Sequence, residues 1–160
     1  MFLQPPEPKL ENLQIYLQHH DKFPGFDNCE LRLQHSFPFL ARLFFELKEH
    51  GINLSVETNG TIPVPDIIDW ICVSPKDQVY PNVSIKQRVG DELKVVYCGQ
   101  DLSMYDDLKQ GFEHHFIQPC YMENDTVEQN GKSFAVVENM VKNNPGWRLS
   151  LQTHKWMGVD

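Results

Sequence analysis

Polar and ionisable side chains collect at four points of the sequence, each directly after a run of β-forming residues. Ligands of parallel α/β sheets bind beyond the carboxyl ends of the strands, where loops present polar groups over a rigid floor. Lysines there suit a carboxylate or another anion, and amide side chains both donate and accept the hydrogen bonds that a heterocycle requires. We therefore expect one small-molecule site, lined by Glu57-Thr58-Asn59-Gly60-Thr61, Ser74-Pro75-Lys76, Gln118-Pro119-Cys120 and Gln152-Thr153-His154-Lys155. Each cluster taken alone could equally be an ordinary turn, since Asn-Gly and Ser-Pro are common turn dipeptides.

The strands that would deliver these clusters can be located from the spacing of apolar residues. Alternation, or enrichment in β-forming residues, predicts strands at 30–34, 52–57, 67–73, 93–97, 115–118 and 147–151. Residues 77–91 have little periodicity and are expected to pass over the edge of the sheet. Short strands with helices between some of them indicate an α/β layer built on a mostly parallel sheet.

Three helices are predicted from near-helical spacing of apolar residues. The first runs from Leu10 to about His19, and the second begins at an N-cap on Ser36 and ends at Gly51. The third is centred on 134–141 and ends near 143–145, where two asparagines precede a proline.

Length and charge limit the kind of partner. The chain has 160 residues, 41% of them hydrophobic and 22% charged, which predicts one soluble globular domain. Its formal charge of -8 argues against nucleic-acid binding, because that affinity depends on Lys and Arg displacing counterions. No apolar run is long enough for a bilayer, and Met1–Lys9 does not have the order of a secretory signal, so we expect a cytoplasmic protein with no membrane partner.

The cysteines and histidines do not have metal-ligand spacing. Cys29, Cys72, Cys98 and Cys120 are more than twenty residues apart, so we expect reduced thiols packed as small hydrophobes. Cys98 and Cys120 are each expected at the end of a strand. The pairs His19-His20 and His114-His115 cannot readily share a metal, because adjacent residues of a strand point to opposite faces. We therefore predict no metal site.

The polar clusters also carry a resemblance. In order and spacing, the chain resembles the 7-carboxy-7-deazaguanine synthases, a family of radical S-adenosylmethionine enzymes, over roughly Ser36 to Asp160. The segments that match are Leu54–Thr61, Asp69–Lys76, Asp91–Tyr97, Phe116–Cys120 and Trp147–Lys155.

The resemblance implies a fold, a reaction and a set of ligands. The fold would be a partial, incomplete α/β barrel, as in the C-terminal half of radical S-adenosylmethionine enzymes, and the family works as a homodimer. Its reaction contracts the ring of the pterin substrate 6-carboxy-5,6,7,8-tetrahydropterin in queuosine-type deazapurine synthesis, with a 4Fe-4S cluster and magnesium. By the resemblance S-adenosylmethionine would contact Ser74, Pro75, Lys76, Gln118, Pro119, Cys120 and Tyr121. Glu57, Thr58 and Asn59 would lie near the same cofactor, and Asp160 would reach toward the substrate.

The sequence departs from the family before residue 36. The family binds its cluster through C-x-x-x-C-x-x-C, followed by a threonine that helps to hold magnesium, and neither is present here. A Gly-Gly-Glu-Pro turn expected just before Gln34 is replaced by 28–33, where only Glu30 is in register. Residues 1–35 are therefore interpreted as a divergent N-terminal segment and 36–160 as the C-terminal part of a radical S-adenosylmethionine-like domain.

Three functions remain open from the sequence. The leading hypothesis is a partial synthase that keeps the cofactor- and substrate-facing loops but cannot cleave S-adenosylmethionine alone, with no catalytic residue assigned. The alternative is a non-catalytic module that binds a ligand or a partner chain, because exposed strand edges recruit partners. The third is a decayed product without function.

Overall fold

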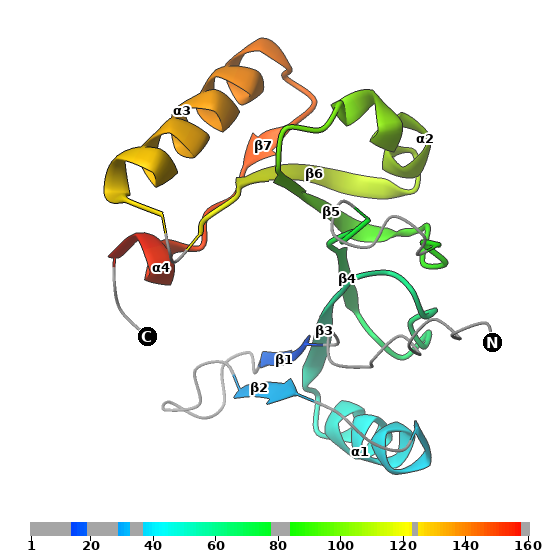
Figure 1. Ribbon diagram of the computed structural model, residues 1–160. Helices are drawn as coiled ribbons and strands as arrows, with labels where there is room; N and C mark the ends of the chain where they lie inside the picture. The colour runs from blue at the N-terminus through cyan, green and yellow to red at the C-terminus, as the bar shows by residue number, and fades with distance from the viewer. Residues whose placement is uncertain (1–13, 19–28, 33–36, 78–83, 123–124, 158–160) are drawn as a thin grey trace, which may run out of the picture.

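The computed structural model describes residues 14–18, 29–32, 37–77, 84–122 and 125–157 (Figure 1). Seven strands form one sheet in the order β2-β1-β3-β4-β5-β6-β7. Neighbouring strands from β3 to β7 are parallel, whereas β1 pairs antiparallel with both β2 and β3. The strands are β1 Gln14–Gln18, β2 Cys29–Arg32, β3 Asn53–Thr58, β4 Trp70–Val73, β5 Gly90–Tyr97, β6 Phe112–Pro119 and β7 Arg148–Leu149. The two ends of this sheet, β2 and β7, stay apart in Figure 1, so the fold is an α/β sheet that is curved but not closed, as the prediction of a partial barrel requires.

Helices cover one face of the sheet. They are α1 Phe37–Glu49, the 3-10 helix η1 Leu102–Tyr105, α2 Asp106–Lys109 and α3 Val127–Asn143, while the short helix α4 Thr153–Met157 packs Trp156 against Tyr121 and against Phe134 of α3. In Figure 1, α1 lies beside β3, while α2 and α3 lie beside β5, β6 and β7. No helix in the described part of the chain is long and apolar enough to cross a membrane.

Two apolar cores hold the helices to that face. The smaller one packs Phe44 of α1 against Leu54 and Val56 of β3. The larger one joins helices η1, α2 and α3 to strands β4, β5 and β6 through Val73, Leu93, Val95, Tyr105, Leu108, Phe112, Ile117, Val137 and Trp147. Because side chains alternate along a strand, the residues between these apolar positions must point to the other face.

Local signals explain where the two long helices begin and end. Gly51, with φ of +73°, follows α1, and the N–H groups of Gly51 and Ile52 donate to the carbonyls of Lys48 and Leu47. This pattern is a Schellman motif, which favours glycine because other residues rarely adopt a left-handed backbone. At the start of α3, Thr126 and Gln129 form a reciprocal capping box.

Two aspartates fix the start of the parallel strands. Asp69 Oδ2 accepts a hydrogen bond from Leu54 N at 2.7 Å, and Asp91 Oδ2 accepts one from Ile71 N at 2.6 Å. In both cases an aspartate at the beginning of one strand takes up a backbone donor of the strand before it. These contacts help to set the register, because a shift of one residue would leave both the carboxylate and the N–H group without a partner.

The predicted helix between Leu10 and His19 is wrong where the structure describes this segment. Residues 14–18 form β1, whose Ile15 and Leu17 stand opposite Val56 and Leu54 in the ladder with β3. Apolar residues at 15 and 17 fit a period of two as well as a helical one, and pairing with the otherwise open edge of β3 decides between them. The remaining residues of the predicted helix, and the predicted N-cap Ser36, lie outside the described residues.

The other elements were predicted in the right place, with shifted boundaries. Strands β5 and β6 start three residues earlier than predicted, and β4 starts three residues later, at Trp70. The predicted strand at 147–151 shortens to two residues, and α3 begins seven residues before Phe134. The helix α4 and the pair η1 and α2 were not predicted at all.

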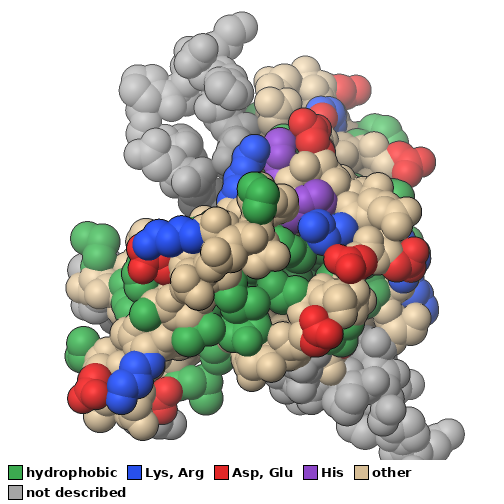
Figure 2. All heavy atoms as spheres, turned by 90° about the horizontal axis from the view of Figure 1, so that it is seen from above, with side chains coloured by type: hydrophobic (Ala, Val, Ile, Leu, Met, Phe, Trp, Pro, Cys, Tyr) green, Lys and Arg blue, Asp and Glu red, His purple; other side chains and the backbone are tan. Residues whose placement is uncertain are grey.

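Apolar side chains also remain exposed on the helical side of the molecule. Figure 2 looks onto the side that carries α2 and α3 and shows hydrophobic side chains over the middle of it. Val136 of α3 and Met104 of η1 are among the exposed hydrophobic residues of these helices. Surface of this kind often marks a contact with another protein.

Replacing Gly60 should destabilise the fold more than replacing Gly51. Both have positive φ, but a Cβ at Gly60 would stand 2.8 Å from Val73 Cγ1, whereas nothing lies within 4 Å at Gly51. We expect Gly51→Ala to lower the free energy of unfolding by about 1–2 kcal/mol through backbone strain. Gly60→Ala should add roughly 1–3 kcal/mol of overpacking. Urea unfolding of both variants measures the difference, and equal losses would contradict the close packing at Gly60.

Candidate small-molecule site on the inner face

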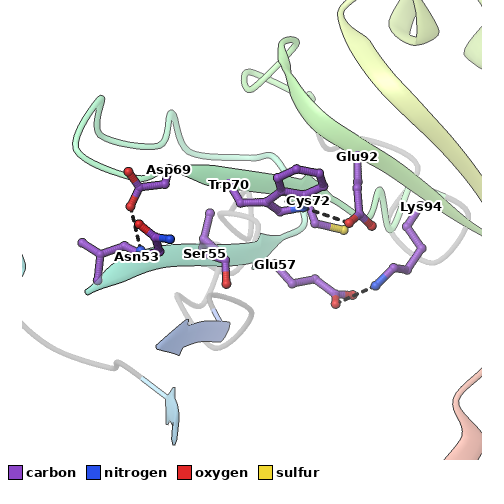
Figure 3. Close-up of a pocket in the computed structure, with 10 residues that line it drawn as sticks. Asn53, Ser55, Glu57, Asp69, Trp70, Cys72, Glu92 and Lys94 are labelled. Atoms are coloured by element: carbon purple, nitrogen blue, oxygen red, sulfur yellow. Dashed lines mark hydrogen bonds and ion pairs between the residues drawn. The ribbon is translucent and has the colours of Figure 1, made fainter. Parts of the chain in front are cut away.

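The face of the sheet opposite the helices, here called the inner face, carries an open cavity of about 740 Å³. Strands β3, β4 and β5 line it with Asn53, Ser55, Glu57, Asp69, Trp70, Cys72, Glu92 and Lys94 (Figure 3). Most of these are the residues that alternate with the apolar positions of the two cores. The cavity is therefore built by the pleat of three adjacent strands, with a polar floor.

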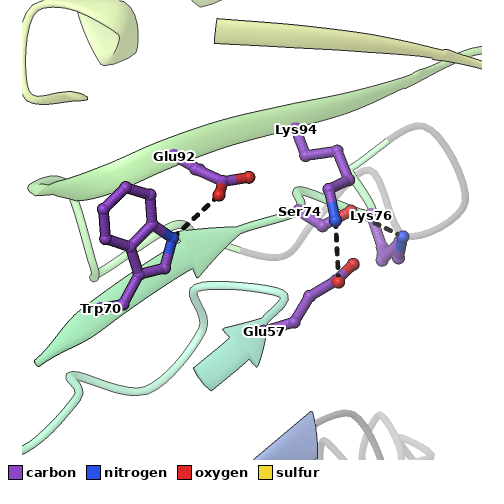
Figure 4. Close-up of polar contacts among 6 residues, drawn as sticks. All are labelled: Glu57, Trp70, Ser74, Lys76, Glu92 and Lys94. Atoms are coloured by element: carbon purple, nitrogen blue, oxygen red, sulfur yellow. Dashed lines mark hydrogen bonds and ion pairs between the residues drawn. The ribbon is translucent and has the colours of Figure 1, made fainter. Parts of the chain in front are cut away.

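An ion pair crosses this floor (Figure 4). Lys94 Nζ of β5 lies 2.9 Å from Glu57 Oε2 of β3, spanning β4, and the two side chains are only 18% and 27% exposed. Burial by itself lowers the pKa of the Lys94 ammonium, but Cys72, Glu57 and Glu92 act in the opposite direction, and the pKa ends above its ordinary value. The lysine is thus held in its charged form by the carboxylates around it.

A second polar contact lies closer to the amino ends of the strands. Trp70 Nε1 donates to Glu92 Oε1 at 2.8 Å, and the Trp70 ring stacks on His114 of β6 with centroids 5.7 Å apart. The ladders pair Cys72 with Glu92 and Glu92 with His114, so this contact continues the inner face across to β6. His115, the next residue, instead packs against Trp147 of the larger core, as alternation along a strand predicts.

Cys72 lies between these two contacts and is not a reactive thiol. It is 5% exposed, and burial, as the largest effect, raises its pKa to about 12. Because this thiol is buried and almost entirely protonated near neutral pH, it is not a nucleophile.

The predicted Ser74-Pro75-Lys76 cluster lies at the carboxyl end of β4, next to the cavity. Lys76 Nζ donates to Ser74 Oγ at 2.9 Å, and Ser74 and Pro75 are buried (Figure 4). Burial lowers the pKa of Lys76, while the nearby Glu57 opposes that shift. Lys94, Cys72 and Cys98 also act on the pKa of Lys76, so groups from the ends of three strands lie within electrostatic reach of one ammonium.

Gln118 is the predicted site residue with the most unusual surroundings. It belongs to the same face of β6 as His114, stands opposite Val96 in the ladder and is 8% exposed. Its side-chain amide has no hydrogen-bond partner among the residues that the structure describes. A buried amide normally has one, because leaving it unpaired costs about 1–3 kcal/mol. Its neighbour Pro119 is fully buried.

Glu57 is the only residue of the first predicted cluster that lines the cavity. Thr58 is buried on the helix side of β3, and its hydroxyl oxygen accepts from Gly60 N. Asn59 Oδ1 accepts from both the N–H and the hydroxyl of Thr61, which makes Asn59 part of the turn.

The last predicted cluster is mostly helical. Thr153, His154 and Lys155 belong to α4, although the prediction placed them directly after an extended strand. Tyr121 packs edge-on against Trp156 of α4, with centroids 5.3 Å apart, so α4 contacts the loop that follows β6. The predicted substrate residue Asp160 lies outside the described residues.

Sequence reasoning missed Trp70, Cys72, Glu92 and Lys94, which make up much of the cavity floor. The alternation of polar and apolar residues along the strands could have predicted them. Asn53, Ser55 and Glu57 of β3 alternate with the buried Leu54 and Val56, and Glu92 and Lys94 of β5 alternate with the buried Leu93 and Val95. A parallel sheet covered by helices on both faces would carry apolar residues at those positions too.

The described residues do not form a cluster site for iron and sulfur or a magnesium site. They contain no group of three His, Cys, Asp or Glu side chains placed to hold a metal ion. Among Cys72, Cys98 and Cys120, the cysteines whose side chains are described, only Cys98 and Cys120 lie close together, and Cys72 is buried with a raised pKa. A 4Fe-4S cluster bound by three thiolates therefore has no ligand set in this part of the chain.

The fold and the candidate site define a class: an open α/β sheet of the partial-barrel type, with a polar cavity on its inner face and polar side chains at the strand ends. No protein-family model matches the chain. It is 43% identical over 117 residues to the 7-carboxy-7-deazaguanine synthase of Bacteroides thetaiotaomicron, which covers 73% of this chain and 56% of that protein. The enzymes of the same name from Burkholderia multivorans and Prochlorococcus marinus are 40% and 30% identical, over 68% and 79% of this chain and 48% and 64% of their own length.

Over the matched residues, this chain belongs to the 7-carboxy-7-deazaguanine synthase family. It spans about half the length of the relatives it matches first. The family assignment made from the strand-end motifs is thereby confirmed.

Breaking the ion pair on the cavity floor should cost stability in a pH-dependent way. Glu57→Gln leaves the largely buried Lys94 without its paired carboxylate, so we expect a loss of about 1–3 kcal/mol in the free energy of unfolding at neutral pH. The folded pKa of Lys94 lies above its ordinary value of 10.5. The contribution is therefore complete below about pH 10.5 and disappears as the pH rises through the folded pKa.

Urea unfolding at pH 7, 9 and above 10.5 tests this expectation. The matched control is Glu46→Gln, which removes the exposed pair between Arg42 and Glu46 and should cost at most about 0.5 kcal/mol. A Glu57→Gln variant that is no less stable than the control, or whose deficit is the same at every pH, would contradict the role of the pair.

Proposed function

We propose that this chain provides the cofactor- and substrate-binding surface of a 7-carboxy-7-deazaguanine synthase, a radical S-adenosylmethionine lyase that contracts the ring of 6-carboxy-5,6,7,8-tetrahydropterin in queuosine biosynthesis. The observation that carries the proposal is the buried amide of Gln118 on the inner face, at the same sheet edge as Ser74 and Lys76, which has no hydrogen-bond partner within the described part of the chain. If no ligand bound there, the missing hydrogen bond of this buried amide would lower the stability of the fold without any compensating gain.

The chemistry of these groups fits an adenosyl ligand. S-adenosylmethionine carries a carboxylate, an ammonium group and an adenine ring. Lys76 offers a positive charge, Ser74 a hydroxyl group and Gln118 an amide that matches the donors and acceptors of a heterocycle. In the proposal Pro75, Pro119, Cys120 and Tyr121 shape the surroundings of this ligand, and Glu57, Thr58 and Asn59 bound it on the side of β3.

The cavity floor fits the substrate. A carboxylated pterin presents an anionic group and a ring edge rich in N–H donors. Lys94 can attract the carboxylate, while Glu92 can accept from the ring edge. Because Lys94 is already paired with Glu57, and Trp70 with Glu92, the substrate would meet side chains that need little reordering. Asp160 would reach the same substrate from the C-terminal end.

We further propose that the chain does not cleave S-adenosylmethionine by itself. That reaction needs an electron from a 4Fe-4S cluster, which the family also combines with magnesium, and the described residues contain no ligand set for either. In the proposal those ligands come from outside the described residues, for example from a second polypeptide. The chain would then act in the cytoplasm, as a homodimer or with that second chain, and the exposed apolar side chains near α3 and η1 offer a surface for association.

The alternative proposal is a binding module that holds S-adenosylmethionine or a purine-like ligand without catalysis. The same observations on Gln118 and Lys76 support it. The two proposals differ only in whether a partner that restores cluster binding also restores turnover.

Ligand binding can be tested on two buried glutamines. Gln118→Leu should weaken the binding of S-adenosylmethionine about tenfold, the loss of one hydrogen bond, without lowering stability. Gln87 is also buried, but its amide accepts from Val64 N and donates to the Val89 carbonyl. Gln87→Leu should therefore lower the free energy of unfolding by about 1–3 kcal/mol and leave affinity unchanged.

Isothermal titration calorimetry and urea unfolding separate the two effects. The proposal fails if the wild-type chain does not bind S-adenosylmethionine, or if Gln118→Leu binds it as tightly as the wild type does.

Turnover can be tested by anaerobic reconstitution of the chain with iron, sulfide and a reductant. We expect no 5'-deoxyadenosine above the level of a sample without protein, because three thiolates cannot converge within the described residues. Chromatographic detection of 5'-deoxyadenosine in more than stoichiometric amount would overturn the claim that the chain is inactive alone.

A further inference from the structure

Three sulfur atoms lie together where β5 and β6 end. Cys98 follows β5, and Cys120 follows β6, directly after the last pair of the ladder, Tyr97 with Pro119. The Cys98 thiol lies within electrostatic reach of the Cys120 thiol. Cys120 Sγ also lies 3.7 Å from the thioether Sδ of Met122. Cys120 is thus the centre of a sulfur cluster that consists of Cys98, Cys120 and Met122.

The spacing of these sulfurs suits ligands that share one ion. Metal–sulfur bonds near 2.3 Å place two sulfur ligands of the same ion about 3.8–4.0 Å apart, for tetrahedral and trigonal arrangements respectively. Neighbouring parallel strands hold their register partners about 4.8 Å apart at the backbone, with side chains on the same side of the sheet. The strand ends therefore keep the two thiols close without a local turn between them.

The cluster is open to solvent and has a cation beside it. Cys98 and Met122 are exposed and Cys120 is half-buried, so an ion can reach them. Desolvation, and after it the Cys120 thiol, raises the pKa of Cys98 to about 11, while Lys76 opposes this shift. Lys76 would likewise balance the negative charge that remains when two thiolates hold a monovalent cation.

We propose that Cys98, Cys120 and Met122 form a binding site for copper(I). Soft thiolate and thioether sulfurs select this ion, and three ligands satisfy it. Zinc prefers four ligands of nitrogen and thiolate sulfur, so it should bind less well here. Binding transfers no electron: two S–H groups lose their protons to the buffer, and two copper–thiolate bonds and one copper–thioether bond form. The inference is argued from the strand register and the sulfur contacts and not from the proposed function, although Cys120 and Lys76 belong to both sites.

The test is anaerobic competition between the reduced full-length chain and bathocuproine disulfonate, a chelator whose copper(I) complex is coloured. Copper(I) is supplied as its acetonitrile complex. We expect one ion per chain. Cys98→Ser and Cys120→Ser should each lower the copper(I) affinity by more than the about 10–100-fold that is lost when a group that only orients a metal ligand is removed, because each removes a direct ligand. Lys76→Gln should cost about tenfold by that same measure. Affinity should rise with pH between 6 and 8, because protons compete with the metal.

The controls separate this site from general thiol chemistry. Cys72→Ser removes a buried thiol outside the cluster, and Met104→Leu removes an exposed methionine outside it, so both should bind copper(I) like the wild type, whereas Met122→Leu should bind less tightly. Circular dichroism verifies that each variant is folded. Wild-type affinity in Cys98→Ser and Cys120→Ser, or an equal loss in Cys72→Ser, would overturn the proposal. X-ray absorption that finds oxygen or nitrogen ligands in place of sulfur would do the same.

Discussion

The parallel sheet buries only one of its faces under helices, and the rest of the molecule follows from this constraint. Strands β3 and β5 must alternate strictly, because Leu54, Val56, Leu93 and Val95 fill the two cores. The residues between them therefore face a region that none of the described helices covers. Polar groups there must find partners across the strands, and the pair of Glu57 with Lys94 is the clearest example. The cavity is thus a consequence of one-sided packing and of the charges that this packing requires on the other side.

The edge of the sheet at β3 is a second consequence of the same architecture. A parallel strand at an edge exposes backbone donors and acceptors that recruit other strands. Here β1 takes up that edge in antiparallel pairing, and β2 continues from β1. Both strands lie within residues 1–35, interpreted from the sequence as divergent from the family. What the ladder does show is that the segment before α1 belongs to the same sheet as the matched residues.

Prediction from the sequence was accurate where a local pattern has one physical meaning. The α1 stop at Gly51 and the alternation of β3 are of this kind, since only a left-handed residue and only a two-faced strand explain them. It failed at β1, because Ile15 and Leu17 satisfy two periods, and only the partner strand β3 decides between them. It also failed for α4, a helix of five residues that packs Trp156 against Tyr121 and Phe134 and has no periodicity long enough to read.

The residues at the strand ends, which form the rim of the candidate site, were predictable from the sequence, whereas the residues on the floor of the cavity were not. Ser74, Lys76 and Gln118 stand next to turn-forming residues, so the sequence marks them as strand ends. Glu92 and Lys94 lie inside a strand, where a charge is ordinarily read as solvent-exposed, and only the order β3-β4-β5 brings them opposite Glu57 and Trp70.

The rim and the floor of the candidate site differ in whether their polar groups already have hydrogen-bond partners. Glu57, Trp70, Glu92 and Lys94 satisfy one another across three strands, so a ligand on the floor meets groups whose positions are already fixed. Gln118 on the rim is different: its buried amide gains a hydrogen bond only if something from outside the described residues provides it. An unpaired buried amide destabilises a protein by more free energy than a typical hydrogen bond contributes net. A ligand that pairs with this amide removes that destabilisation, which favours binding at the rim. A site that binds two ligands side by side, one above the cavity and one at the strand ends, needs a floor that orients the first and a rim that gains a hydrogen bond from the second.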